Sequence, residues 1–390
     1  MANSTYIKHG SKQATWMLIL LALLFLASLL TVFKAPTYHL WLVAIAVSEY
    51  SLLWAAGTAV LLIAGFWLQK YQLASVMIGL LALGLFLSPV ARAYIAAATV
   101  KKEFNKAFGA GSTIIKGDNT QPPFSFLKLF KFAGKQPVYN TLTYSPADKL
   151  TLDYYPAQFG GKKPCIIVIH GGSWSSGDSR QLPELNNYLA AQGYNVASIN
   201  YRLAPQYQAP LTVNDVKQAF AYLRKNADQL NIDTGNFVLL GRSAGAQIAL
   251  LAAYTLHEAG LKGIIDFYGP ADMVWGYSAP ASKLVMDSRA VMERYLGGTY
   301  KAVPEKYFDS SPIEFVNRQT VPTLIIHGSN DVLVSPVHSS KLNAKLQQCG
   351  VRHFYLNLPW ATHGFDYHLN GPGGQLSTYV TERFINAVCR

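Results

Sequence analysis

Charged residues are scarce in this sequence. Asp, Glu, Lys and Arg make up 14% of its 390 residues, against about 25% in soluble globular domains. The deficit is concentrated in the first 100 residues, where long apolar runs dominate. A chain of this length is consistent with two structural units, and the uneven charge indicates that the first unit is not an ordinary soluble domain.

Cysteines are also few. Cys165, Cys349 and Cys389 are the only three, and no Cys-x-x-Cys pair occurs, so a cysteine-based metal site is not expected. Three cysteines neither require nor exclude a disulfide. The formal net charge of +12 is scattered, without a nucleic-acid-binding motif. Proximity to anionic lipid explains this charge more simply, and we expect no nucleic-acid partner.

Three apolar runs predict a membrane region over residues 1–100. The runs are Trp16–Phe33, Leu40–Leu68 and Leu73–Val90. Because a hydrocarbon core is about 30 Å thick, we expect three transmembrane helices at about residues 16–33, 45–68 and 73–92. The first run exceeds the apolar core of a signal peptide, which has about 7–15 residues, and two more runs follow it. These features favour an integral membrane protein in contact with lipid.

Glu49 alone interrupts the second run. A position near the membrane interface explains this acid more simply than a function inside the membrane. The basic residues give conflicting signals on orientation. Their total favours a cytoplasmic C-terminal unit, whereas the flanks of the first run favour the opposite side. The side of the membrane that carries the C-terminal unit stays open.

The remaining chain divides into a linker and a folded domain. Residues 101–136 are predicted to be a juxtamembrane linker, in which Phe124–Phe132 interleaves aromatic residues with lysines. This stretch could lie among lipid headgroups or pack on the domain that follows. Over residues 137–390, short apolar strand-like runs alternate with helical patterns. This alternation predicts an α/β fold with a doubly wound, mostly parallel sheet and a small cap insertion at about residues 271–320.

One pentapeptide has the context of a catalytic nucleophile. Gly241-Arg242-Ser243-Ala244-Gly245 lies between a predicted strand at 237–240 and an apolar helix at 244–256. A Gly-x-Ser-x-Gly elbow requires this context, because the serine occupies a sharp, strained turn between strand and helix. The helix also directs its N-terminal dipole at the reacting centre. Although the pentapeptide alone arises by chance, its position makes Ser243 the predicted nucleophile.

A serine hydroxyl needs a base to become a good nucleophile. His363 follows the last predicted strand, and the glycine after it leaves room for the ring to reach the serine. His327 and His353 lie in or beside strands and are expected to be structural. His338 and His368 are expected on surface elements. His363 is therefore the predicted base.

The base in turn needs a carboxylate that fixes its tautomer and stabilises the imidazolium ion. Asp331 lies just beyond the carboxyl end of a predicted strand at 323–327, upstream of His363. Asp266 and Asp272 flank another strand end and are the competitors. We predict that Asp331 is the catalytic acid.

His170-Gly171-Gly172-Ser173-Trp174 follows an earlier strand-like run, Cys165–His170. Two glycines let the backbone approach a substrate carbonyl, so the amides of Gly171, Gly172 and Ala244 are the expected oxyanion donors. A glycine-rich turn without a catalytic role is the alternative. Trp174 is expected to pack in the core or to form a wall of the substrate pocket.

Together these motifs resemble the carboxylesterase-type α/β-hydrolases with a His-Gly-Gly-x-Trp loop, close to the hormone-sensitive-lipase-like esterases. The resemblance runs from about Leu150 to the C-terminus. It implies an α/β-hydrolase fold, a Ser243–Asp331–His363 triad in the chain order Ser, Asp, His, and oxyanion donors at Gly171, Gly172 and Ala244. The sequence departs from lipase-like members at Ser173, where they carry a third glycine. It departs again at Ala246, where many relatives have glycine.

We therefore expect a membrane-anchored serine hydrolase that cleaves a small carboxylic ester, with lipophilic esters favoured by the nearby bilayer. The mechanism requires an acyl-enzyme but no metal or cofactor. An acyltransferase, amidase, peptidase or thioesterase could use the same triad, because fold does not determine the acceptor. An inactive hydrolase-like domain could instead serve as a membrane binding module, although the complete triad argues against it.

Overall fold

The computed structural model describes residues 2–68, 70–109, 121–131 and 138–389, so the predicted linker boundary at residues 136 and 137 lies outside the described residues. Eight strands form one sheet in the order β1-β2-β4-β3-β5-β6-β7-β8. β1 and β2 run antiparallel to their neighbours, and the other six strands are parallel. This arrangement confirms the doubly wound, mostly parallel sheet predicted from the sequence. The strands are β1 (Asn140–Ser145), β2 (Leu150–Tyr155), β3 (Lys163–Ile169), β4 (Asn195–Ile199), β5 (Ile232–Arg242), β6 (Leu261–Phe267), β7 (Thr323–Gly328) and β8 (His353–Leu358).

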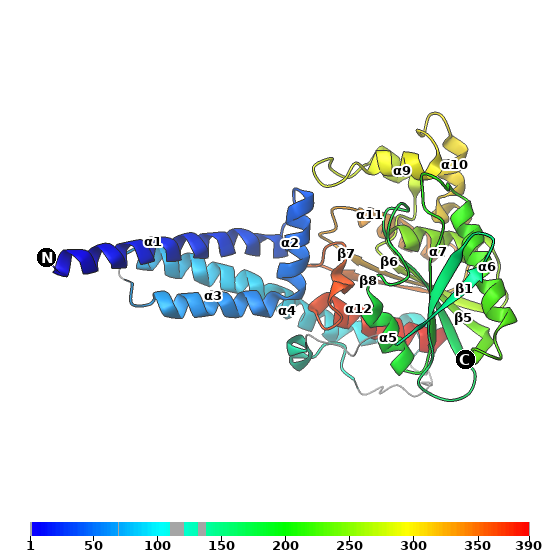
Figure 1. Ribbon diagram of the computed structural model, residues 1–390, viewed down its shortest axis with the longest axis horizontal. Helices are drawn as coiled ribbons and strands as arrows, with labels where there is room; N and C mark the ends of the chain where they lie inside the picture. Colours follow the sequence, from blue (N-terminus) through cyan, green and yellow to red (C-terminus); the bar gives the residue numbers. More distant parts are fainter. Residues whose placement is uncertain (1, 69, 110–120, 132–137, 390) are drawn as a thin grey trace.

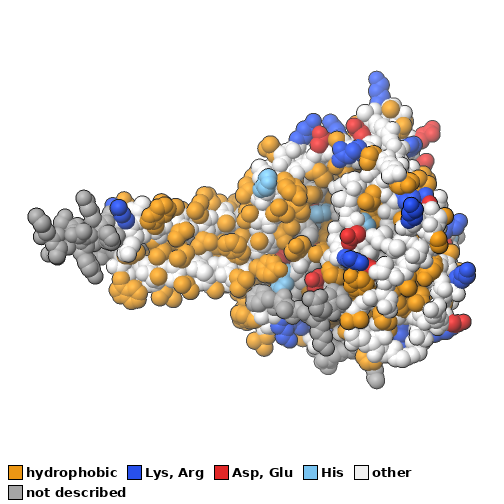
Figure 2. Space-filling view, viewed as in Figure 1, with side chains coloured by type: hydrophobic (Ala, Val, Ile, Leu, Met, Phe, Trp, Pro, Cys, Tyr) orange, Lys and Arg blue, Asp and Glu red, His pale blue; other side chains and the backbone are white. Residues whose placement is uncertain are grey.

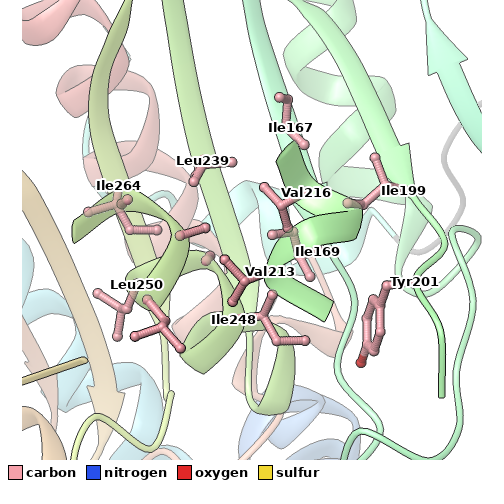
Figure 3. Close-up of a cluster of buried hydrophobic side chains, with 14 of the residues drawn as sticks. Ile167, Ile169, Ile199, Tyr201, Val213, Val216, Leu239, Ile248, Leu250 and Ile264 are labelled. Carbon is pink, nitrogen blue, oxygen red and sulfur yellow. The ribbon is translucent and has the colours of Figure 1, made fainter. Parts of the chain in front are cut away.

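Helices cover both faces of the sheet (Figure 1). α5 (Pro183–Ala191) and α12 (Pro372–Val388) contribute to the core on one face, and α6 (Leu211–Lys225), α7 (Ala244–Thr255) and α11 (Val337–Gln348) to the core on the other. Successive side chains of β3 alternate between these cores. Ile166 and Val168 pack towards α5 and α12, whereas Ile167 and Ile169 pack towards α6 and α7 (Figure 3). Burial on both faces explains why β3 has a continuous apolar sequence.

A helical insertion separates β6 from β7. It contains α8 (Met273–Ser278), α9 (Ser288–Leu296), α10 (Pro304–Asp309) and a 3₁₀ turn, η3 (Pro312–Phe315). Asp272 and Asp287 begin the first two helices by accepting backbone N–H groups of Trp275 and Ala290, as expected for N-cap residues. The insertion leaves the sheet at the carboxyl end of β6, next to the end of β5.

Among the described residues before the sheet, the α-helices are α1 (Ala2–Ser28), α2 (Tyr38–Glu49), α3 (Ser51–Gly65) and α4 (Gln72–Phe108). α1, α3 and α4 form a rod that projects from the rest of the molecule, and α2 crosses the base of this rod (Figure 1). Hydrophobic side chains cover most of the visible rod surface, whereas charged side chains gather on the other part (Figure 2). Two segments, Lys12–Thr31 and Gln72–Phe108, are long and apolar enough to cross a membrane.

The second expected helix, at residues 45–68, is broken at Tyr50. α2 and α3 meet there at 84°, and α3 has 15 residues. At 1.5 Å per residue it is about 22 Å long, shorter than a hydrocarbon core of about 30 Å. Glu49 explains the break: its side chain is buried, and its Oε2 accepts the backbone N–H of Gly373 at 2.9 Å. This contact holds α2 against α12 instead of in line with α3.

The third expected helix, at residues 73–92, continues to Phe108, so the predicted linker begins with eight helical residues. Phe104 and Phe108 are buried. The ring of Phe104 lies 5.5 Å from that of Phe354 in β8, and the ring of Phe108 lies 5.3 Å from that of Phe384 in α12. The end of α4 is therefore part of the core on one face of the sheet.

The aromatic and lysine-rich stretch also packs on the folded domain as far as residue 131. It contains a 3₁₀ turn, η2 (Phe126–Phe130). Phe124 and Leu129 are buried, and the backbone N–H of Ser125 donates to Gln375 Oε1 at 2.8 Å. Leu127 remains 75% exposed. Packing on the domain, one of the two alternatives, is therefore observed, with one apolar side left uncovered.

Candidate active site

Ser243 lies between β5 and α7, in the strand–turn–helix context that the sequence predicts. Its φ of 53° and ψ of −121° are strained for a residue that carries a side chain. A Cβ on Gly241 would lie 2.4 Å from Cα of Ala246, and one on Gly245 would lie 2.2 Å from the carbonyl oxygen of His170. Both positions therefore require glycine if the turn is to pack against the neighbouring strand and helix.

Asp331 and His363 meet although they come from separate loops. Nδ1 of His363 lies 2.7 Å from Oδ2 of Asp331, so the protonated Nδ1 donates to the carboxylate. The other oxygen, Oδ1, accepts the backbone N–H groups of Leu333 and Val334, each at 2.9 Å. These bonds fix the carboxylate, and because the contact with the acid uses Nδ1 of His363, Nε2 is the nitrogen that could serve as a general base.

His327 makes a second contact with the same acid. Its Nε2 lies 3.1 Å from Asp331 Oδ2, and its Nδ1 lies 2.6 Å from Ser339 Oγ. Burial alone would raise the pKa of Asp331. Attraction to His363 and hydrogen bonds from both imidazoles outweigh it and hold this pKa well below its usual range. The carboxylate is therefore ionised when it contacts His363.

Ser243 and Asp331 line one cavity of about 610 Å³, together with Trp174. His363 is not among the lining residues; it contacts Asp331, and its ring lies 4.4 Å from the ring of Tyr268. Tyr268 directly follows β6, whose last residue, Phe267, accepts the backbone N–H of Ser243 at 2.9 Å. Ser243 Oγ makes no hydrogen bond to the other described residues. A nucleophile–base contact is often long before substrate binds.

The prediction that Gly171 donates to an oxyanion is wrong for this conformation. Its backbone N–H already donates to Gln181 Oε1 at 2.7 Å, and an amide has only one hydrogen to give. The loop nevertheless lies against the predicted nucleophile, because a Cβ on Gly171 would be 3.3 Å from Cβ of Ser243. Gly172 has a φ of +122°, and a Cβ there would lie 2.0 Å from the carbonyl oxygen of Ser176. Only glycine fits at that position.

The amides of Gly172, Ser173 and Ala244 donate to no other residue of the described ranges. Ser173 and Ala244 also line the cavity. In the sequence, Ser173 stands out only as a departure from related loops. Its φ of +54°, which brings its amide into this set, could not be read from the sequence.

Trp174 forms a wall of the cavity and is also buried. Its indole Nε1 donates to Gln247 Oε1 at 2.9 Å. Its ring stacks on Tyr295 of α9, with centroids 4.5 Å apart and planes 5° from parallel. The side chain therefore packs in the core, lines the cavity and joins α7 to the helical insertion, and its contact with substrate stays a prediction.

The two competing acids have other partners. Asp266 accepts the backbone N–H of Gly269 at 2.7 Å, and burial raises its pKa to about 7. Asp272 pairs with Lys341 and caps α8. Neither acid contacts His363 among the described hydrogen bonds and ion pairs. The geometry therefore favours Asp331, as the position of the acids in the sequence did.

Two histidines expected on the surface are buried. His338 lies edge-on against Trp275 at 4.8 Å, and burial lowers its pKa to about 3. The ring of His368 stacks on Tyr50 at 4.4 Å. These partners come from the helical insertion and from the bend between α2 and α3. The expectation was wrong because local sequence does not reveal such distant contacts.

A buried ion pair joins the elbow to the segment after His363. Arg242 Nε lies 2.6 Å from Asp366 Oδ2, and both side chains are 2% exposed. The hydroxyl of Tyr268 donates to the other carboxylate oxygen of Asp366. This network connects the residue before Ser243 with the residue three positions after His363.

Arg242→Met is expected to destabilise the protein, because it leaves Asp366 buried without its cation. Loss of one partner of a buried ion pair lowers the free energy of unfolding by about 3–5 kcal/mol. Arg224→Met is the matched control, since the Arg224–Glu258 pair is 28% and 17% exposed and should contribute no more than about 1 kcal/mol. Chemical unfolding of the full chain in detergent micelles measures both. Equal losses in the two variants would contradict the importance assigned to the buried pair.

α2 contacts the histidine loop directly, which the sequence analysis did not anticipate. Trp41 Nε1 donates to the backbone carbonyl of His363 at 3.0 Å, and Ile45 packs beside Gly364. Nothing in the local pattern of an apolar run distinguishes a tryptophan that contacts lipid from one that contacts a catalytic loop. The contact requires the bend at Tyr50.

Known proteins resemble this chain in sequence and in fold. The family model described as BD-FAE matches residues 152–346. Esterase LipC of Mycobacterium tuberculosis is 32% identical over 245 residues, which cover 58% of this chain and 59% of LipC. Esterase LipQ of the same organism is 29% identical over 223 residues, covering 53% and 51%. The chain thus spans between half and three-fifths of the length of these relatives.

The solved structure of a bacterial heroin esterase superposes with a TM-score of 0.58 at 19% identity, covering 65% of this chain and 84% of that protein. At such low identity the likeness establishes the α/β-hydrolase fold alone. The family match shows membership as well as fold, because residues 152–346 make up half of the 390-residue chain. The chain belongs to the BD-FAE family, among the carboxylesterase-type α/β-hydrolases.

Proposed function

We propose that this protein is a serine hydrolase of carboxylic esters, anchored in a membrane by its N-terminal helices. The observation that carries the proposal is the 2.7 Å contact between His363 and Asp331, made beside a cavity that Ser243 lines. A buried, ionised acid that contacts an imidazole can orient it as a general base for a serine, and the strained Ser243 lines the same cavity as this acid. The esterase names of the relatives support the same class of reaction.

In the proposed reaction, Ser243 Oγ attacks the carbonyl carbon of the ester while Nε2 of His363 accepts the hydroxyl proton. Asp331 stabilises the resulting imidazolium ion. His363 then gives the proton to the departing alcohol, which leaves an acyl group on Ser243. Water attacks this acyl-enzyme by the same route and releases the free acid.

The negative oxygen of each tetrahedral intermediate needs hydrogen-bond donors. We assign this role to the amides of Gly172, Ser173 and Ala244, which lack partners among the described residues. Ala244 is also the first residue of α7, so the helix dipole favours negative charge there. Removing one such donor typically costs about 10²–10³ in rate.

Anchoring is proposed from the rod. Its candidate spans Lys12–Thr31 and Gln72–Phe108 have mean hydropathies of 2.3 and 2.2. Exposed side chains on these spans include Leu23, Leu26, Leu80 and Ile95. Water would be an unfavourable solvent for so much apolar surface, whereas acyl chains would not.

The test uses the full chain in detergent micelles with p-nitrophenyl butyrate and the matching p-nitroanilide. We expect one butyrate released for each p-nitrophenolate, much slower cleavage of the anilide, and no butyryl transfer to added alcohol. Cleavage of the anilide at a similar rate would favour an amidase or peptidase. Transfer of most butyryl groups to the alcohol would favour an acyltransferase.

A further inference from the structure

The wall of the catalytic cavity includes residues from outside the family-matched domain. Lys34, Ala35 and Pro36 line it from the connection between α1 and α2, opposite residues of the helical insertion such as Leu284 and Met292. A hydrogen bond joins the two sides, because the backbone N–H of Tyr38 donates to the carbonyl oxygen of Leu284 at 3.1 Å. The proposed membrane region and the helical insertion therefore close the cavity together.

Exposed lining residues at this junction include Lys34, Pro36 and Leu284, which we define as the mouth of the cavity. Leu284 is 71% exposed, and Phe33, next to the mouth, is 61% exposed. Such apolar exposure beside a cavity is unfavourable in water and indicates a surface that contacts another apolar phase.

The depth of the mouth follows from the length of α1 and its 3₁₀ extension. The candidate span Lys12–Thr31 has 20 residues, which at 1.5 Å per residue extend about 30 Å, the thickness of a hydrocarbon core. Lys34 comes three residues after this span. With this span across the hydrocarbon core, as proposed above, the mouth lies at headgroup level in the leaflet on the side of the sheet.

The cavity lining is mostly apolar and includes few titratable side chains. Most side chains around the cavity are apolar, among them Trp275, Val285, Met286, Met292, Val332, Leu333 and Val334. The titratable groups that line it are Lys34, Asp331 and His338. Asp331 is paired with His363, and burial keeps His338 neutral by lowering its pKa to about 3. Lys34 makes no ion pair with a described residue, so its ammonium group is available at the mouth.

We propose that the cavity receives an ester-bearing amphiphile directly from this leaflet, with its acyl chain in the apolar interior and its anionic headgroup against Lys34. This proposal rests on the proposed ester hydrolysis and adds the class of substrate. A volume of about 610 Å³ is within the range of about 300–1,000 Å³ found for ligand cavities. Lys34 acts by binding the headgroup and takes no part in the chemical steps.

The experiment uses the full chain reconstituted in vesicles of a neutral ether lipid that lacks cleavable esters. Phosphatidylglycerol and phosphatidylcholine carrying the same fluorescent acyl chain are added separately, and release of the labelled fatty acid is followed. We expect the wild type to cleave the anionic lipid roughly fivefold faster than the zwitterionic lipid, because one basic residue near a membrane surface attracts anionic lipid by about that factor. The ratio of the two rates is the readout.

Lys34→Gln should bring this ratio close to one, and Lys34→Arg should retain it. Lys102→Gln is the matched control. Lys102 is an exposed lysine near the C-terminal end of α4, but it does not line the cavity. A ratio near one in the wild type, or an equal loss in Lys102→Gln, would overturn the proposal. So would cleavage of p-nitrophenyl butyrate without cleavage of either lipid, an outcome that leaves ester hydrolysis intact. If none of the three esters were cleaved, the proposed ester hydrolysis itself would be contradicted.

Discussion

Replacing Ser243 with alanine is expected to lower the turnover of p-nitrophenyl butyrate by about 10⁴–10⁶. The variant keeps the cavity, the free amides and the His363–Asp331 pair but has no oxygen that can form an acyl-enzyme. The remaining rate would come from substrate binding and from the oxyanion donors alone. The measurement is kcat in detergent micelles, with a fluorophosphonate probe to report covalent labelling of the nucleophile.

Ser278→Ala is the control for the loss of a hydroxyl. Ser278 is exposed on α8 of the helical insertion and does not line the cavity. This variant should keep its turnover within a few-fold of the wild type and should still react with the probe. Equal turnover by the wild type and Ser243→Ala, or unchanged labelling of Ser243→Ala, would contradict the proposed nucleophile.

Asp331→Asn is expected to lower kcat by about 10⁴, the loss seen when an uncharged amide replaces the acid of such a triad. The amide cannot stabilise the imidazolium ion, and its NH₂ group can donate to Nδ1 of His363. Nε2 would then carry the proton and could not act as a base. His327, which also contacts Asp331 at 3.1 Å, makes this carboxylate a shared acceptor, so its loss disturbs two imidazoles.

Asp266→Asn is the matched control for this second prediction. Asp266 is equally buried and lies in the neighbouring strand β6, but its carboxylate accepts from Gly269 instead of His363. We expect its kcat to fall by less than about tenfold. A large loss in Asp266→Asn combined with near-normal turnover in Asp331→Asn would reverse our choice of acid.

Local sequence was sufficient where a short segment determines its own geometry. The β5–Ser243–α7 elbow could be predicted because Gly241 and Gly245 fit only a turn that packs tightly on both sides. The sheet could also be predicted, because strands buried on both faces, such as β3, have continuous apolar sequences. Asp331 could be selected because it follows a predicted strand at the edge where catalytic loops gather.

Long-range contacts could not be predicted in this way. Gln181 binds the amide of Gly171, although nothing in either segment marks the other as its partner. The break at Tyr50 depends on Glu49 reaching Gly373, more than 300 residues later. An apolar run has the same appearance whether its side chains contact lipid or protein. For this reason neither the bend within the expected span at 45–68 nor the continuation of the third helix to Phe108 could be predicted.

The continuity of α4 has a practical consequence. Its 37 residues extend about 55 Å at 1.5 Å per residue, and its last turns fill a gap against Phe354 and Phe384. A truncated chain that began after this helix would lose part of its hydrophobic core and would expose apolar surface, which favours aggregation during purification. α4 is therefore both part of the proposed membrane region and part of the core beside β8 and α12, so a soluble variant would have to keep its last turns.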